Sequence, residues 1–305
     1  MNEKTQKDTI ANDGWMRGPY TVSRGYGSTG KDAGGFQVLV KEVGFKSHVF
    51  ATCPEGTPVR FGGRFKVPIA QGILDAAGAS ASADANSNSN ASEDRDATQR
   101  VVMVATGVGV GPCVGASELL LAAARPGADA EASDNGSDHD NHEIRAIDVL
   151  ASYRTTEEIA MESDLEALRE SSSETMAFRW KSIVTGTDGR LSASGPEVLA
   201  NRYLRPGAEF DSDSVSATRG THYHIIGNGQ LVNEWRGGLE RAGVPADRVT
   251  VEAYFNHAAE ADPSAVDTIC EAIRLLDSES ESSNYSMSNS NEPMVVDVEE
   301  TSAVA

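Results

Sequence analysis

The sequence predicts an α/β protein whose core is a five-stranded parallel sheet with helices on both faces. Three observations support this prediction. Strand-like and helix-like segments alternate between residues 99 and 276. The strand-like segments are largely continuous apolar runs, which is typical of parallel strands that are buried on both faces. Glycine-rich turns follow two of these runs and lead directly into helix-like segments.

The order of the elements predicts the topology of the sheet. Runs rich in β-branched and aromatic residues predict strands at 101–105, 143–153, 178–184, 222–226 and 248–254. Helix-like segments follow them at 112–124, 157–169, 196–203, 231–242 and 264–276. Right-handed crossovers then give the strand order 3-2-1-4-5. In that order the first and fourth strands flank the switch point, where ligands bind.

The residues before 76 have a different character and predict a separate small β domain over 1–75. Segments 34–43 and 57–65 are punctuated by glycine, and Phe36, Val38 and Val40 alternate with polar residues, which favours antiparallel strands. Three other stretches carry few large apolar side chains, and we expect them to be disordered. They are a linker at 76–98, an insert at 127–141 within the α/β domain of 99–276, and an acidic tail at 277–305.

Composition excludes several classes of partner. The net charge of −20 repels phosphate backbones and anionic lipid, so we expect neither nucleic acid nor a membrane surface as a partner. No apolar run approaches the roughly 20 residues that span a bilayer, and the N-terminus does not read as a signal peptide. The three cysteines, at 53, 113 and 270, form neither a disulfide framework nor a zinc site. A reducing compartment is therefore expected, either the cytoplasm or an organellar matrix or stroma.

Histidines give no metal site. The motif HDNH at 139–142 falls in an acidic insert, where a solvated loop is the simpler interpretation. His222 and His224 share one face of the fourth predicted strand, and we expect a structural role for them.

Two glycine turns carry the functional prediction. ATGVGVGP at 105–112 follows the first predicted strand, and IIGNGQLV at 225–232 follows the fourth. A glycine turn at a helix start lets a phosphate approach free backbone N–H groups. Because these two strands are expected to be neighbours, the turns should face one crevice and bind a dinucleotide. The alternative is a glycine-rich turn without a ligand. The residues assigned to the two turns are Thr106, Gly107, Val108, Gly109, Pro112, Gly227, Asn228 and Gly229.

Together with three further motifs, these turns resemble the ferredoxin–NADP reductase superfamily, which includes cytochrome b5 reductase. The further motifs are RGPYTVS at 17–23, GFKS at 44–47 and AGVPADRVTVEAYF at 242–255. The resemblance covers residues 17–257 apart from the inserts. It implies a partial antiparallel FAD-binding β-barrel followed by the NAD(P)-binding sheet.

The resemblance also implies roles for single residues. Tyr20 would lie against the isoalloxazine, Thr21 would bond near flavin N5, and Glu252 and Tyr254 would lie near the flavin. These four form the predicted catalytic set. The other residues implied in cofactor binding are Arg17 and Ser23 of the first motif, Gly44, Lys46 and Ser47 for the FAD pyrophosphate, and Arg154, which would pair with a 2′-phosphate and favour NADPH.

The chain departs from the family pattern in five places. Arg17 lies one position too far from Tyr20 for the family's Arg-x-Tyr-Ser/Thr motif, which puts its phosphate contact in doubt. Val108 stands where Thr or Ser is usual, Ile226 replaces a cysteine beside the nicotinamide, and Gly229 replaces a proline. Only 16 residues precede Arg17, whereas about half of the barrel precedes this motif in the family. The resemblance therefore implies a chain that is incomplete at its N-terminus, where a targeting segment would also be missing.

The predicted function is an FAD-dependent oxidoreductase that passes hydride from NAD(P)H to flavin and electrons onward to an acceptor. The expected cofactors are FAD and NAD(P)H, and the expected partners are the nucleotide substrate and an electron-acceptor protein. Such an enzyme mainly positions two rings and needs no acid–base dyad. The alternative is a non-catalytic nucleotide-binding or interaction protein derived from such a reductase.

Overall fold

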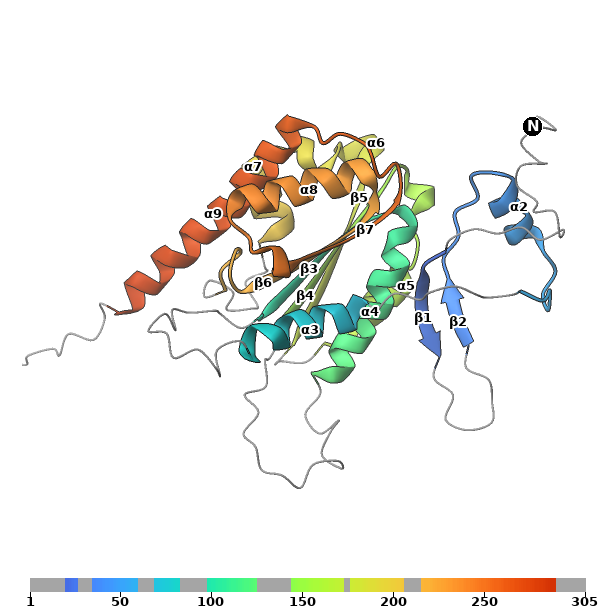
Figure 1. The fold of residues 1–305 in the computed structure, drawn as a ribbon, viewed down its shortest axis with the longest axis horizontal. Helices are drawn as coiled ribbons and strands as arrows, with labels where there is room; N and C mark the ends of the chain where they lie inside the picture. The colour runs from blue at the N-terminus through green and yellow to red at the C-terminus, as the bar shows by residue number, and fades with distance from the viewer. Residues whose placement is uncertain are drawn as a thin grey trace, which may run out of the picture.

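A computed structural model describes residues 20–26, 35–59, 69–82, 98–124, 144–172, 176–205 and 215–288. Within this part of the chain, a five-stranded parallel sheet forms the centre, with a small antiparallel hairpin at one side (Figure 1). The strand order is β5-β4-β3-β6-β7, which is the predicted order 3-2-1-4-5 and confirms the fold class. The strands are β3 (Arg100–Thr106), β4 (Ala146–Tyr153), β5 (Ala177–Val184), β6 (Thr221–Asn228) and β7 (Val249–Phe255).

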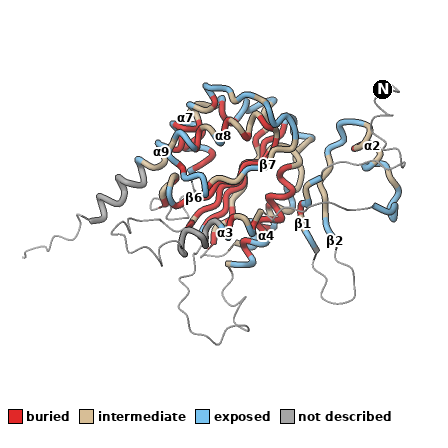
Figure 2. The backbone as a smooth tube through the Cα atoms, viewed as in Figure 1, coloured by how far each residue is buried: buried red, intermediate tan, exposed pale blue. Residues whose placement is uncertain are grey.

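Helices cover both faces of the sheet. One face packs on α3 (Ile69–Ser82), α4 (Val110–Ala123) and α5 (Glu162–Glu170). The other packs on α8 (Gly229–Ala242), α9 (Pro263–Ser288) and the turns η4 (Leu191–Ala193), α7 (Pro196–Val198) and η5 (Leu199–Leu204). The central strands are buried along most of their length (Figure 2). None of the described helices combines the length and apolar character of a bilayer span.

The alternation of side chains in the central strand explains the two-sided core. Val101 and Met103 of β3 join the cluster under α4, whereas Val102 and Val104 join the cluster under α8. All four are fully buried. A strand with apolar residues on both faces is stable only between two layers of helices, which is what the uninterrupted run VVMVA predicts.

The hairpin of β1 (Val22–Tyr26) and β2 (Gly35–Val38) is antiparallel, and α2 (Phe45–Thr52) follows it. Strand β1 lies directly against α4. A β-carbon on Gly115 would overlap the carbonyl oxygen of Ser23, and one on Gly111 would overlap the Ser23 hydroxyl. The two glycines therefore permit backbone contact between the strand and the helix.

Arg24 reinforces this contact. Its Nη2 atom lies 3.0 Å from Glu118 Oε1 on α4 and 2.8 Å from Asp164 Oδ1 on α5. The Arg24 side chain is only 16% exposed, so these charges are screened less than those of a surface pair. Strand β1 is thus held to two helices of the α/β body by packing and by charge.

Two buried histidines lie on the face of β6 that bears Ile226. His222 Nε2 and His224 Nδ1 lie 3.0 and 2.8 Å from the hydroxyl of Thr250 on β7. Burial lowers the pKa of His222 to about 4, helped by the charge of Arg248. Burial, with a smaller effect of His222, lowers the pKa of His224 to about 3. Both rings are therefore neutral near pH 7, as a structural role requires.

Several predicted boundaries differ from the structure. Helix α3 runs to Ser82, so the start of the stretch at 76–98 is helical rather than disordered, and the expected domain limit at residue 75 falls inside a helix that packs on the sheet. Alanine is frequent in this segment and has the highest helix propensity. Likewise α9 continues to Ser288, into the expected tail at 277–305, because extending a helix costs less than starting one.

Other differences are local. The helix expected at 157–169 is split into η3 (Thr156–Glu158) and α5, with Met161 between them at a φ of 60°. The helix expected at 196–203 is a short α-turn that continues as a π-helical turn. Residues 57–59 form no strand, and 60–65, the insert 127–141 and the motif at 139–142 lie outside the described residues.

We expect Gly115→Ala to lower the free energy of unfolding by about 1–3 kcal/mol, because the new methyl group displaces β1 from α4. Urea denaturation measures this change. Gly72→Ala on α3 is the matched control, since no atom lies within 4 Å of the position of its β-carbon. The control should raise helix stability by about 0.5–1 kcal/mol. Equal effects of the two substitutions would contradict the packing assignment.

We expect the stability of the fold to decrease as the pH falls from about 6.5 toward 3. The folded-state pKa values of His222 and His224 are lowered, so the unfolded chain binds more protons in this range. The contribution of the neutral rings is complete above about pH 6.5 and is lost below it, on the order of 3 kcal/mol for His222 alone.

Urea unfolding at a series of pH values tests this expectation. The variant His222→Gln cannot titrate at this position, so its stability should fall less steeply with acid than that of the wild type. Identical pH dependence in the two proteins would show that His222 does not contribute.

Candidate nucleotide and flavin site

The two glycine turns lie side by side at the carboxyl edge of the sheet. Strands β3 and β6 pair in parallel, and their ends lead into the two turns. A β-carbon on Gly109 would lie 3.1 Å from the carbonyl oxygen of Ile226, and one on Gly227 would overlap the Thr106 hydroxyl. Gly107 and Gly227 have φ values of 54° and 157°, which favour glycine. The glycines therefore allow the two turns to touch.

The helix starts at these turns differ in their free backbone groups. At α8, the side chain of Asn228 accepts a hydrogen bond from the backbone N of Leu231 at 3.0 Å. At α4, the N-cap Gly109 has no side chain to do this. The sequence predicts Pro112 as the first residue of this helix, whereas it is the third residue of α4. It still lies in the first helical turn, where the backbone N–H groups have no partner within the helix, so proline is tolerated. The glycine turn before α4 therefore offers more accessible backbone N–H groups for an anion than the turn before α8 does.

A large cleft of about 2400 Å³ runs from α2 across the hairpin to these turns and to the ends of β4 and β5. Pockets for one small molecule usually measure about 300–1,000 Å³, so this cleft has room for two ligands side by side. The predicted residues that line it are Tyr20, Thr21, Ser23, Gly44, Lys46, Ser47, Thr106, Gly107, Val108, Pro112, Arg154, Asn228, Glu252 and Tyr254. Gly109, Gly227 and Gly229 do not line it, and Arg17 lies outside the described residues.

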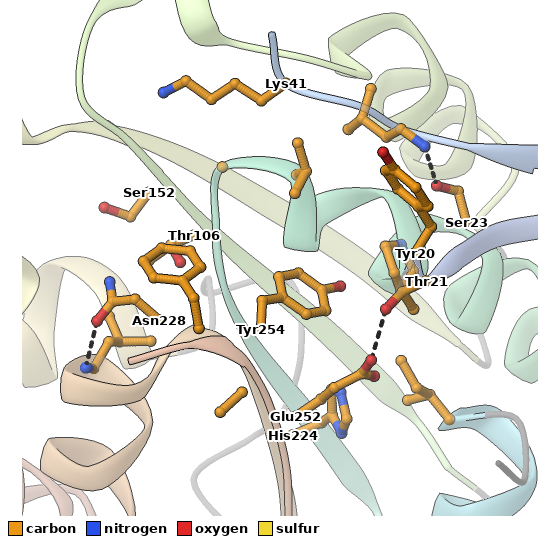
Figure 3. A pocket seen from close by; sticks show the side chains of 18 of the residues that line it. Tyr20, Thr21, Ser23, Lys41, Thr106, Ser152, His224, Asn228, Glu252 and Tyr254 are labelled. Atoms are coloured by element: carbon orange, nitrogen blue, oxygen red, sulfur yellow. Dashed lines mark hydrogen bonds between the residues drawn. The ribbon is translucent and has the colours of Figure 1, made fainter. Parts of the chain in front are cut away.

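The predicted catalytic residues meet at one end of the cleft (Figure 3). Thr21 Oγ1 donates a hydrogen bond to Glu252 Oε1 at 2.7 Å, which joins the segment before β1 to β7. Burial raises the pKa of Tyr254, and a hydrogen bond with Thr21 opposes the rise. The ring of Tyr20 is 43% exposed and tilts against Phe50, with centroids 5.4 Å apart. Residues far apart in sequence thus form one aromatic and hydroxyl-bearing surface.

Two predicted serine contacts are already occupied. Ser47 Oγ accepts hydrogen bonds from the backbone N atoms of Val43 and Gly44, at 2.8 and 3.0 Å, and donates to the Gly44 carbonyl. It therefore closes the start of α2. Ser23 Oγ accepts from the backbone N of Leu39 at 3.2 Å, and Ser23 is 3% exposed. Its position against α4 explains why serine, with a small side chain, stands there.

The opposite end of the cleft is cationic. Arg154 follows β4 and is exposed, and its guanidinium makes no hydrogen bond or ion pair with the described residues. The backbone N of Gly186 donates to the Arg154 carbonyl at 3.1 Å, which ties the loops after β4 and β5 together. Arg190, also exposed and in the cleft lining, follows β5. Two arginines therefore flank the place where the sequence predicted an adenosine phosphate.

One cation of the cleft and its partner carry no signal in the sequence. Lys41 Nζ lies 2.7 Å from Glu158 Oε1, and both residues line the cleft. Lys41 follows the hairpin, whereas Glu158 belongs to η3 after β4, so the pair joins opposite walls. Figure 3 shows the Lys41 side chain extended on the cleft side that also holds Ser152 and Thr106. In sequence Lys41 is only one polar residue in an alternating segment, and nothing there indicates its partner.

Two buried titratable groups at the cleft, Cys113 and Tyr153, stay protonated near neutral pH. Burial, with the charge of Glu252 as a second cause, raises the pKa of the Cys113 thiol. Burial raises the pKa of Tyr153 to about 12, although its hydroxyl donates to the Ala160 carbonyl at 3.0 Å. The Cys113 thiol is therefore no nucleophile here. Among the described residues no group of three potential ligands could hold a metal ion.

The three cysteines differ in exposure. All are free, Cys113 and Cys270 are buried, and Cys53 on the α2 side is partly exposed. Cys53 Sγ lies 3.1 Å from the Phe50 carbonyl oxygen.

Comparisons with known proteins give structural matches only. No family model and no curated protein matches the chain in sequence. The flavohemoglobin of Malassezia yamatoensis, solved with bound FAD and heme, is 13% identical, with a TM-score of 0.45 over 81% of this chain and 49% of that one. The flavohem-like FAD/NAD-binding domain of Vibrio cholerae nitric oxide dioxygenase is 13% identical, with a TM-score of 0.41 over 77% and 76%. Ferredoxin–NADP+ reductase from Plasmodium falciparum is 13% identical, with a TM-score of 0.40 over 77% and 76%.

The chain spans about half the length of the flavohemoglobin. At these identities the likeness is one of fold.

Proposed function

We propose that the chain binds FAD and NAD(P)H and belongs to an oxidoreductase that passes hydride from the nicotinamide to the flavin, and electrons onward to an acceptor. One observation carries the proposal. A single cleft joins the residues of the flavin motifs, at Tyr20, Thr21, Glu252 and Tyr254, to Gly107 and Val108 of the first glycine turn. Hydride transfer requires two rings in contact, and only a site that holds both ligands provides this.

The residues at the hairpin end fit a flavin ring. Tyr20 presents an exposed aromatic ring to the cleft, and Thr21 and Tyr254, which also line it, bring hydroxyl groups. When bound, the flavin supplies the hydride-accepting centre. Thr21, whose hydroxyl donates to Glu252, would help to hold the ring in place. Tyr254, whose pKa is raised, remains a neutral phenol that packs without adding charge.

The residues at the other end fit a nucleotide. The first glycine turn presents backbone N–H groups at the start of α4, which favour a diphosphate. Arg154 and Arg190 supply positive charge on the cleft rim, near the ends of β4 and β5. Their chemistry suits the 2′-phosphate of NADPH, since guanidinium groups bind phosphate through paired hydrogen bonds.

A non-catalytic binding protein is the alternative, and one feature favours it. Ile226 stands at the end of β6, where the resemblance implies a cysteine beside the nicotinamide, and its side chain packs on Gly109. A nucleotide would still bind in the cleft, but no thiol would lie beside the nicotinamide ring from which hydride leaves. The two functions differ in whether electrons move from nucleotide to flavin.

We expect the purified protein to bind FAD and to lose flavin absorbance when NADPH or NADH is added without oxygen. Tyr20→Ala should weaken FAD binding about tenfold, because the stacking face is removed. Phe36→Ala is the control, since Phe36 is similarly exposed but lies outside the cleft lining. A protein that ignores FAD would contradict the proposal, and one that binds FAD but is never bleached would favour the alternative.

We expect Arg154→Ala to raise the Michaelis constant for NADPH more than that for NADH, by roughly tenfold in ratio, because a charged hydrogen bond to the 2′-phosphate is lost. Steady-state reduction of an artificial acceptor measures both constants. Arg219→Ala, at an exposed turn outside the cleft lining, should leave both unchanged. Equal increases for the two nucleotides would remove the 2′-phosphate role of Arg154.

A further inference from the structure

The carboxylate of Glu158 is held in the cleft as a bound anion would be. Its Oε1 atom lies 2.7 Å from Lys41 Nζ, and its Oε2 atom accepts a hydrogen bond from the backbone N of Arg154 at 3.3 Å. An ammonium group and a backbone N–H are donors that proteins commonly present to phosphate. The third group nearby, the Arg154 guanidinium, makes no bond with the described residues.

The position of this carboxylate places it in the path of a nucleotide. Glu158 and Lys41 both line the cleft, as do Gly107 of the phosphate-binding turn and Arg154. The ion pair joins the segment after β2 to the turn after β4, so it crosses between the flavin side and the nucleotide side. An anionic ligand that enters here finds the Lys41 ammonium and the Arg154 backbone N–H already bound to the Glu158 carboxylate.

The ion pair between Lys41 and Glu158 is partly exposed, so a bound anion can take the place of the carboxylate. The Lys41 and Glu158 side chains are 44% and 26% exposed, so solvent screens their attraction. The hydrogen bond with Lys41 is the main reason that the pKa of Glu158 lies below its usual value, so the carboxylate is ionised near pH 7. Glu158 lies in a turn of three residues, and its side chain reaches solvent.

We propose that Glu158 is an internal competitor of the nucleotide: its carboxylate occupies the Lys41 ammonium and the Arg154 backbone N–H, and a nucleotide phosphate must displace it to bind. This inference rests on the proposed function. Glu158 then sets the affinity for the nucleotide without contacting it in the bound state. Displacement frees Glu158 to solvent and transfers Lys41 to the ligand, so the two walls of the cleft are joined through the phosphate.

Binding of NADP+ and NAD+ to the FAD-loaded protein, measured by isothermal titration calorimetry, tests the proposal. Glu158→Gln keeps the size of the side chain but removes its charge, and should tighten nucleotide binding about three- to tenfold. Glu157→Gln is the matched control, because Glu157 is the neighbouring exposed carboxylate and bonds to Thr155 rather than to Lys41. It should change the dissociation constant less than about twofold. Lys41→Ala combined with Glu158→Gln should abolish the gain.

A second readout needs no nucleotide. Acylation of lysines by an N-hydroxysuccinimide ester, followed by mass spectrometry, reports how accessible Lys41 is. Labelling of Lys41 should increase severalfold in Glu158→Gln, should not change in Glu157→Gln, and should fall again when NADP+ or pyrophosphate is added to Glu158→Gln.

The outcomes separate the competitor role from the proposed function. If the wild type binds nucleotide and Glu158→Gln binds it no more tightly, Glu158 is no competitor, and the function proposed above stands. If neither protein binds nucleotide or pyrophosphate, both proposals fail. If only Glu158→Gln binds, the competitor role is supported in its strongest form.

Discussion

The contact between β1 and α4 is the constraint on which the site depends. Gly111 and Gly115 let the backbone of β1 reach the surface of α4, and Arg24 adds ion pairs to Glu118 and Asp164. Since Tyr20 and Thr21 directly precede β1, this contact decides where they stand relative to the sheet. The same helix begins at the glycine turn at 107–109, so one element positions both halves of the cleft.

A common feature of the cleft is that many of its polar groups already have internal partners. Thr21 bonds to Glu252, Ser47 closes its own helix, Asn228 caps α8, and Lys41 pairs with Glu158. Unpartnered polar groups are costly away from water, so a stable fold satisfies them before any ligand arrives. Ligands then bind by exchanging these partners, and the affinity reflects a difference between two sets of bonds. Two groups depart from this pattern: the exposed guanidinium of Arg154, and His224 Nε2, which is buried and has no hydrogen-bond partner among the described residues.

Much of the fold was predictable because its signals are local and repeated. The buried runs at β3 to β7 alternate with helices, and the handedness of crossovers then fixes the strand order. Helix α3 escaped prediction because its small residues resemble those of a disordered linker until Ala70 and Ile73 are seen to pack on the sheet. The break at Met161 has no clear sequence signal, since a positive φ is uncommon for methionine.

Where a motif is continuous in sequence, as at the glycine turn and at Glu252 and Tyr254, the sequence predicted which residues line the cleft. Roles that depend on tertiary contact were not predictable. Ser23 matched a cofactor motif but packs against Gly111, and the pairing of Lys41 with Glu158 joins segments that no local pattern relates. Sequence periodicity reports which way a side chain faces and gives no information on what it meets there.

The distribution of thiols has a practical consequence. Cys113 and Cys270 are buried in the α/β body, whereas Cys53, beside the end of α2, is partly exposed. A maleimide dye should therefore react first at Cys53 and mark the α2 side of the cleft without mutagenesis. Its fluorescence anisotropy would then report directly on whether α2 becomes more rigid as the cleft fills.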